Sequence, residues 1–152
     1  FDEENTDDIR AERSLQPGTG TTDLVAGVAG RYAFGMKNSL IGQVGFIEAL
    51  GSREHFEPGT RLNATVGWSH AVSRKLGTVL QINAAHQDRD QGAQAEPEHS
   101  GSTTVDISPG ITVGVGDRST LYAYAQIPLY QDVNGEQLMP RSAFALGWTT
   151  DF

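Results

Sequence analysis

The segment Phe144-Ala145-Leu146-Gly147-Trp148-Thr149-Thr150-Asp151-Phe152 carries the clearest structural signal in this chain of 152 residues. Successive side chains of a β-strand point to opposite faces, so residues of one parity share a face. The residues of one parity are large and apolar apart from Thr150, namely Phe144, Leu146, Trp148 and Phe152. The residues of the other parity are small or polar, namely Ala145, Gly147, Thr149 and Asp151. The pattern predicts a strand with two unlike faces.

The apolar set of this segment ends on an aromatic residue, Phe152. Strands of outer-membrane β-barrels carry aromatic residues at the membrane interface, whereas a soluble sandwich has no such requirement. Phe144, Leu146, Trp148 and Phe152 resemble the C-terminal signal by which bacterial barrels are recognised for assembly. A transmembrane barrel is therefore an expectation for the rest of the chain.

Similar alternation recurs along the sequence and predicts seven strands, at about 22–35, 39–50, 60–72, 77–88, 102–115, 119–130 and 138–152. The segments between them are alternately short and long, with short ones at 36–38, 73–76 and 116–118 and long ones at 51–59, 89–101 and 131–137. Tight turns at one end and long polar loops at the other are typical of bacterial outer-membrane barrels. We expect an all-β fold, an antiparallel up-and-down transmembrane β-barrel with residues 21–152 as its strands.

Composition is compatible with this fold. Only 38% of the residues are hydrophobic, and no apolar run approaches the ~20 residues of a membrane-spanning helix. A barrel strand needs only about ten residues, half of them apolar. The formal net charge of −8 argues against nucleic acid as a partner, because phosphate contacts need a basic surface. The absence of cysteine excludes disulfides and thiolate metal sites.

The first 20 residues differ from the rest, because they are acidic and then end in Pro17-Gly18-Thr19-Gly20. We expect an extracellular loop or a disordered segment there, and the sequence shows no signal peptide. Seven strands ending in the periplasm would start outside the cell, whereas bacterial single-chain barrels have an even number of strands. The expectation is that this chain is part of a larger barrel, closed by missing N-terminal strands, by a strand within 1–20 or by another chain.

The polar parity of the predicted strands gives candidates for a barrel lumen. Arginine or aspartate facing the middle of a bilayer costs ~2–4 kcal/mol, whereas a polar lumen accepts both. The predicted lumen-lining residues are Arg31, Arg61, Asn63, Gln81, Asp106, Tyr122, Tyr124 and Gln126. Tyr130 shares their parity in 119–130, and the tyrosine rings could stack against a solute or simply pack the lumen.

Three other interpretations remain open. A soluble antiparallel sheet also alternates, with its apolar face inside, so a β-sandwich or a lipocalin-like binder would give the same pattern. A barrel could also conduct nothing and serve as a structural partner of another outer-membrane or surface assembly. The third is a lipid-cleaving barrel, because His70 and His86 fall on the apolar parity near strand ends.

No catalytic motif supports enzymatic chemistry. Ser69 and His70 are adjacent, so a strand points them to opposite faces and they cannot act as a nucleophile and its base. The sequence has no G-x-S-x-G motif, and nothing in it indicates a cofactor or a metal site. We expect a protein that is not an enzyme.

Several motifs resemble one family. Ser108-Pro109-Gly110-Ile111, Leu121-Tyr122 and the stretch 126–138, from Gln126-Ile127-Pro128-Leu129-Tyr130 to Leu138, are similar to the C-terminal part of the outer-membrane family named for the meta-pathway of phenol degradation. Gln16-Pro17-Gly18-Thr19-Gly20 with Asp23 resembles a glycine-rich motif of that family.

The resemblance implies a Gram-negative outer-membrane barrel, a channel for hydrophobic or aromatic small molecules. Its partners would be outer-membrane lipid and lipopolysaccharide and the barrel-assembly machinery. No catalytic residue follows from the resemblance.

Overall fold

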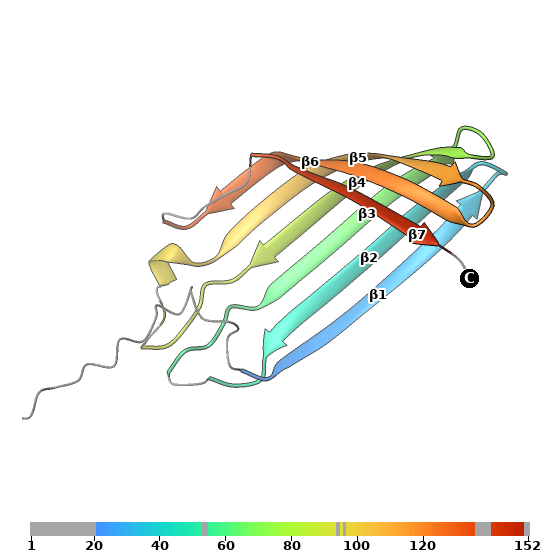
Figure 1. Ribbon diagram of the computed structural model, residues 1–152. Helices are drawn as coiled ribbons and strands as arrows, with labels where there is room; N and C mark the ends of the chain where they lie inside the picture. The colour runs from blue at the N-terminus through green and yellow to red at the C-terminus, as the bar shows by residue number, and fades with distance from the viewer. Residues whose placement is uncertain (1–20, 53–54, 94, 96, 136–140, 151–152) are drawn as a thin grey trace, which may run out of the picture.

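The computed structural model describes residues 21–52, 55–93, 95, 97–135 and 141–150. They form one antiparallel sheet, coloured from blue to red along the chain in Figure 1. Its strands are β1 (Asp23–Phe34), β2 (Asn38–Ala49), β3 (Arg61–Ala71), β4 (Leu76–Gln87), β5 (Ser102–Val115), β6 (Ser119–Val133) and β7 (Ala143–Thr150). A short 3-10 helix, η2 (Pro97–His99), lies between β4 and β5.

Each strand pairs with the next one along the chain, in the order β1 to β7. The predicted all-β, up-and-down arrangement of seven strands is therefore confirmed. Within the described residues β1 pairs only with β2 and β7 only with β6, so the sheet is open at both edges. Figure 1 shows that the open sheet is strongly curved.

The short turns lie together at one end of the sheet. Gly35 and Gly116 occupy two of them with φ of 64° and 68°, a left-handed conformation that glycine adopts without steric cost. The long loops emerge at the opposite end. The predicted alternation of short and long connections is thus the alternation between the two ends of the sheet.

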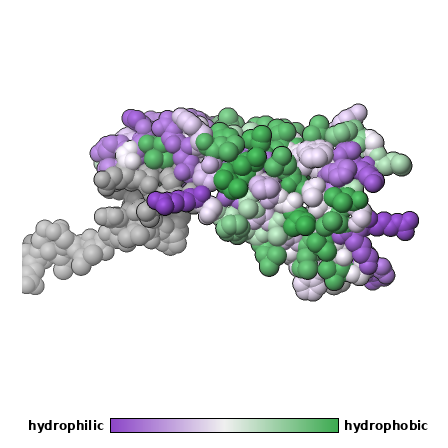
Figure 2. Space-filling model, turned by 90° about the horizontal axis from the view of Figure 1, so that it is seen from above, coloured by the Kyte–Doolittle hydropathy of each residue, from purple (hydrophilic) through white to green (hydrophobic). Residues whose placement is uncertain are grey.

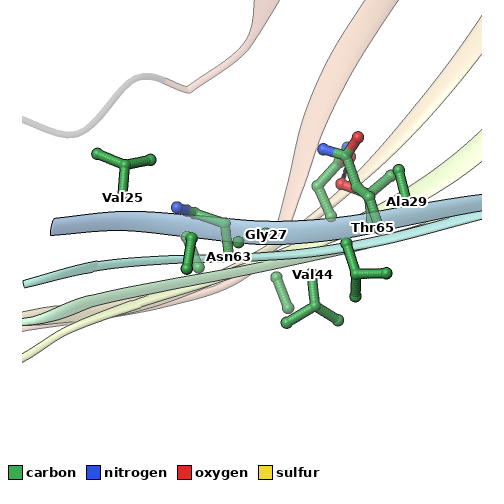
Figure 3. Close-up of a pocket in the computed structure, with 13 residues that line it drawn as sticks. Val25, Gly27, Ala29, Val44, Asn63 and Thr65 are labelled. Carbon is green, nitrogen blue, oxygen red and sulfur yellow. Dashed lines mark hydrogen bonds between the residues drawn. The ribbon is translucent and has the colours of Figure 1, made fainter.

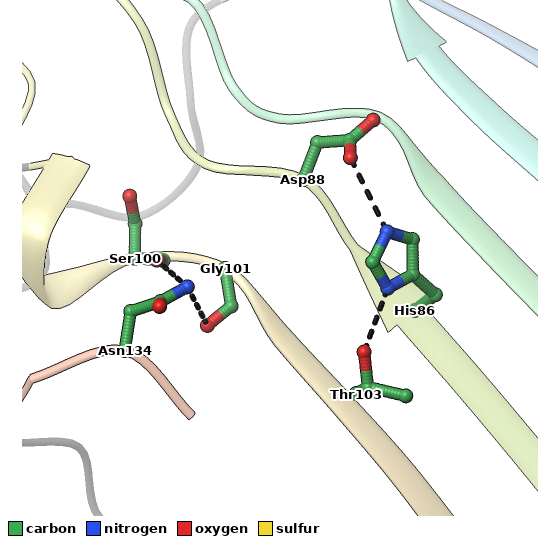
Figure 4. A network of polar contacts seen from close by, with 6 residues as sticks. All are labelled: His86, Asp88, Ser100, Gly101, Thr103 and Asn134. Atoms are coloured by element: carbon green, nitrogen blue, oxygen red, sulfur yellow. Dashed lines mark hydrogen bonds and ion pairs between the residues drawn. The ribbon is translucent and has the colours of Figure 1, made fainter. Parts of the chain in front are cut away.

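The long loops are held to one another by polar contacts, which Figure 4 shows around Asn134. Arg89 Nη2 donates to Asn134 Oδ1 at 2.8 Å, and Asn134 Nδ2 donates to the carbonyls of Ser100 and Gly101 at 3.1 and 3.3 Å. Asp90 accepts from the backbone N–H of Gly59 at 2.8 Å. These contacts join the connections that follow β2, β4 and β6.

A β-bulge corrects one expectation about β6. Asp106 pairs with Pro128 but Val105 pairs with Tyr130, so Leu129 is an extra residue with no partner in the register. The bulge reverses the parity of β6 beyond Pro128. Tyr130 consequently lies on the side of Val105, the apolar side, and not with Tyr122 and Tyr124 as its parity predicted.

The sheet has no hydrophobic core. Among the described residues no hydrophobic side chain is buried, and the two buried polar residues are Ser39 and Ser108. Large apolar side chains are instead widely exposed, and within the strands the exposed fraction reaches 82% for Phe144 and Leu146. Figure 2 shows hydrophobic residues gathered over the middle of the visible surface, with hydrophilic ones towards its ends.

Candidate functional site

The register separates the sheet into two faces of opposite character. Cross-strand partners share a face, and the rows Val28–Val44–Ala64–Ala84–Val105 and Ala29–Gln43–Thr65–Asn83–Asp106 belong to opposite faces. We call them the apolar face and the polar face. In Figure 3, Ala29, Asn63 and Thr65 stand on the side towards which β5 and β6 curl, and Val44 points the other way. The polar face is therefore concave and the apolar face convex.

All eight predicted lumen-lining residues lie on the polar face. Arg31 pairs with Ile41, and Ile41 pairs with Gly67 on its other side. Gly67 in turn pairs with Gln81, so Arg31 and Gln81 lie in one cross-strand row and share a face. The register places the rest on the same face, namely Arg61, Asn63, Asp106, Tyr122, Tyr124 and Gln126.

The two arginines do not form a joint anion site. Arg31 is level with Gly67, and Arg61 is six residues from Gly67 along β3, about 20 Å at ~3.3 Å per residue. Arg31 Nε donates to Ser39 Oγ at 3.2 Å, and the hydroxyls of Ser39 and Ser69 are 2.7 Å apart. Arg31 is thus fixed at the short-turn side of the sheet, far from Arg61 at the loop side.

A second polar chain crosses the middle of the polar face over three strands. Thr65 Oγ1 donates to Asn83 Oδ1 at 3.0 Å, and Asn83 Nδ2 donates to Ser108 Oγ at 3.0 Å. The sequence prediction omitted all three of these residues from the site. Their polar parity in β3, β4 and β5 was visible in the sequence, but only the register brings them together.

Asp106 and Gln126 continue the polar surface towards β6. Gln126 Nε2 donates to Asp106 Oδ2 at 2.7 Å. This contact occupies one oxygen of the carboxylate and one N–H of the amide, and leaves the other N–H and the carbonyl of Gln126 facing the concave side. The carboxylate of Asp106 therefore accepts a hydrogen bond from a neutral amide, and this contact does not neutralise its charge.

The two tyrosines of the polar face lie over glycines of adjacent strands. Tyr124 is opposite Gly110 on β5, and Tyr122 is opposite Gly147 on β7. A Cβ added at either glycine would overlap the facing ring. The rings, whose centroids are 5.8 Å apart, therefore lie along the sheet instead of projecting straight from it.

A hollow of about 310 Å³ opens beside Tyr124 on this face. Its lining consists of Gln81, Asn83, Ser108, Tyr124, Gln126, Ala143, Phe144 and Ala145. Three of the predicted lumen residues, Gln81, Tyr124 and Gln126, meet there, whereas Arg31 and Arg61 lie elsewhere. The hollow can offer a solute one aromatic ring and several amide and hydroxyl groups.

On the apolar face, aromatic and aliphatic side chains occupy different positions along the strands. The aromatic residues within three residues of a strand end are Tyr32, Phe34, Phe46, Trp68, Tyr130 and Trp148. Phe144 begins the short β7 and is opposite Ala125, in the middle of β6. Mid-strand positions carry aliphatic residues such as Val28, Val44, Val66, Ile82 and Ile107. The aspartate and glutamate of this face, Asp132 and Glu48, are also within one residue of a strand end.

The two histidines of the apolar face lie at opposite ends of the sheet. His70 Nδ1 is 2.8 Å from Asn38 Oδ1, which also accepts from Trp68 Nε1 at 3.3 Å. His86 lies between Thr103 and Asp88, with Nδ1 2.8 Å from the hydroxyl and Nε2 3.2 Å from the carboxylate (Figure 4).

The order hydroxyl, imidazole, carboxylate is that of an acyl-transfer relay, but the ring nitrogens are exchanged. In the relay Nε2 contacts the hydroxyl and Nδ1 the carboxylate, whereas His86 presents Nδ1 to Thr103 and Nε2 to Asp88. Thr103 lies on a strand that is paired on both sides, between His86 and Asp132, and the contacts join the ends of β4 and β5.

Phe144, Leu146 and Trp148 of the predicted assembly signal share the apolar face, where their exposed fractions are 82%, 82% and 67%. Phe152 lies outside the described residues, as does the expected loop or disordered segment at 1–20. Within the described part of the chain, no helix is long and apolar enough to cross a membrane. No group of three or more histidine, aspartate or glutamate side chains in that part could hold a metal ion.

No family model, no curated protein and no solved structure matches the chain. The resemblance to the family named for the meta-pathway of phenol degradation therefore stays a prediction from the sequence.

Proposed function

We propose that this chain forms the wall of a bacterial outer-membrane β-barrel that gives passive passage to small solutes. One observation carries the proposal: on the convex face, aliphatic side chains occupy the middle of the strands, and the aromatic ones apart from Phe144 lie near the strand ends. Transmembrane barrels have this outer surface, an apolar band about 25 Å tall between two aromatic girdles. From Val105 to Val115, β5 advances by ten residue steps, about 33 Å at ~3.3 Å per residue, or roughly 25 Å for a strand tilted by ~40°.

The distribution of charge supports the same assignment. Asp106, four residues from the nearer end of β5, lies on the concave face, where water can reach it. A charge in the middle of the convex face would cost about 2–4 kcal/mol in lipid, and none of the described mid-strand positions there carries one.

The open edges at β1 and β7 require partners in this proposal. Unpaired backbone N–H and C=O groups are not tolerated in hydrocarbon, so both edges must pair with further strands. Those strands belong to another part of the same polypeptide or to another chain. Lipid would then contact the convex face and the solute the concave one.

Two competing functions make different demands on the same faces. A soluble β-sandwich or lipocalin-like binder would cover the apolar face with a second layer, and the described residues form only one sheet without a buried apolar side chain. A structural barrel would have the same outer surface but a closed interior. The concave hollow beside Tyr124 favours an interior that admits solutes.

Reconstitution of the full chain separates these functions. The chain is folded in detergent, mixed with liposomes and floated on a density gradient, and the floating fraction is then fused to a planar bilayer. A solute-conducting barrel should float with lipid and give discrete conductance steps. Flotation without conductance would support the structural barrel, and a chain that stays in solution without detergent would contradict membrane insertion.

A further inference from the structure

The hollow beside Tyr124 differs chemically from the hydrophobic channel that the family resemblance implies. Its polar groups are the amides of Gln81, Asn83 and Gln126 and the hydroxyl of Ser108. Neither lysine nor arginine lines it, and the nearest carboxylate, Asp106, is engaged by Gln126. A binding surface for an anion would present donors, and one for a cation would present acceptors, whereas amides and hydroxyls present both.

The free hydrogen-bonding capacity in the hollow is considerable. Gln81 has no side-chain hydrogen bond to any described residue; its side chain lies beside Gly67, where an added Cβ would stand 3.1 Å from Gln81 Cγ. The Asn83 amide donates one N–H to Ser108 and accepts from Thr65 with one lone pair of its oxygen. Its second N–H and the second lone pair remain for a ligand. These contacts also fix the orientation of the Asn83 amide before any ligand arrives, so less side-chain entropy is lost on binding.

Tyr124 adds an aromatic surface of defined orientation. The Cδ1–Cε1 side of the ring lies over Gly110, and the hollow lies beside the ring. A pyranose ring has an apolar C–H face that packs on an aromatic ring and a rim of hydroxyls that each donate and accept. An aromatic ring next to pre-oriented amides matches both features of such a solute.

We propose that the hollow formed by Gln81, Asn83, Ser108, Tyr124 and Gln126 binds a neutral, polyhydroxylated solute, a small free saccharide. The inference rests on the proposed function, in which this face lines the solute path, and it names the class of solute. It differs from the expectation of a hydrophobic or aromatic solute. Such a solute would remove water from the free amides without offering them hydrogen bonds, which is unfavourable.

Binding can be measured without a pore. The full chain is folded in detergent micelles, and saturation-transfer NMR is recorded with maltotriose and, separately, with benzoate. Maltotriose should show transfer to its ring protons and benzoate should not. Tyr124→Leu and Gln81→Ala should each weaken maltotriose binding about fivefold, the loss expected for one stacking contact or one hydrogen bond.

Matched control variants place the effect in the hollow. Tyr32→Leu removes a tyrosine from the apolar face, and Gln87→Ala removes a glutamine from the same strand and face as Gln81, six residues away and outside the hollow. Both should leave the maltotriose signal unchanged. Thermal unfolding of each variant confirms that it is folded.

The outcomes separate the two proposals. Benzoate binding without maltotriose binding, or maltotriose binding that Tyr124→Leu and Gln81→Ala leave intact, would overturn the saccharide assignment. If the chain floats with lipid and conducts but shows no maltotriose signal, the barrel function stands and this inference fails. If it binds maltotriose but never inserts into lipid, the barrel proposal fails and the hollow is a binding site of a soluble protein.

Discussion

The ring of Tyr124 on β6 covers Gly110 on β5, its direct partner in the register. Glycine leaves a strand without side-chain packing, and an aromatic ring laid over it restores that packing. The same relationship joins Tyr122 to Gly147, so β5, β6 and β7 are held by two ring-on-glycine pairs. This arrangement makes the effect of a substitution at Gly110 depend on Tyr124.

We predict that Gly110→Ala lowers the free energy of unfolding by about 1 kcal/mol, because the new methyl displaces the Tyr124 ring. In a Tyr124→Ala background the same substitution should raise it by a few tenths of a kcal/mol, since alanine suits a strand better than glycine. Urea unfolding in micelles measures all four members of the cycle.

Gly45 provides the control for this cycle, because it lies on the same face and a Cβ there would meet nothing within 4 Å. Gly45→Ala should behave alike in both backgrounds. Equal effects of Gly110→Ala with and without Tyr124 would show that the ring does not rest on the glycine.

Val44 and Gln43 are neighbours on β2 that test the identity of the two faces. Val44 is 47% exposed on the convex face, and Gln43 lies on the concave face. We expect Val44→Arg to reduce the folded, lipid-inserted fraction by a factor that corresponds to about 2–4 kcal/mol, and Gln43→Arg to change it little. Heat-modifiable gel migration after insertion into liposomes measures that fraction. A larger loss for Gln43→Arg would mean that the concave face is the one that contacts lipid.

The chain contains two tryptophans, and both lie near the short-turn end of the convex face, at Trp68 and Trp148. In a lipid bilayer both indoles should lie at interfacial depth, where the ring is amphipathic enough to be stable. Lipids brominated close to the headgroup should therefore quench each fluorescence more strongly than lipids brominated near the chain end. Trp68→Phe and Trp148→Phe resolve the two contributions. Absence of quenching by any brominated lipid would refute lipid contact at this surface.

Asn134 is predicted to hold the loop end of the sheet together. It accepts from Arg89 and donates to two carbonyls of the loop before β5, so Asn134→Ala removes contacts with connections distant in sequence. Trypsin should then cleave after Arg89 several-fold faster, while the unfolding midpoint of the strands changes little, because loop opening is a local event. Asp117→Ala, in a short turn at the other end, should leave the cleavage rate unchanged. Equal rates for the parent chain and Asn134→Ala would contradict a role for this residue in loop order.

The sequence alone located the strands, because alternation is a local property with a period of two residues. The predicted segment 102–115 coincides with β5, and 60–72 and 77–88 each differ from the structure by one residue at either end. Residue parity also placed Arg31, Asp106 and Tyr124 on one face. It failed at Tyr130, because the extra residue Leu129 reverses the parity and a bulge depends on the partner strand.

The tertiary structure decided everything that depends on which strands are neighbours and how the sheet bends. Thr65, Asn83 and Ser108 are separated by 18 and 25 residues in sequence, so only the register makes them one hydrogen-bonded chain. The sequence could separate a polar from an apolar face, but either could have been the inner one. The curl of the sheet makes the polar face concave, because twist and curvature arise from the summed geometry of paired strands and not from any single segment.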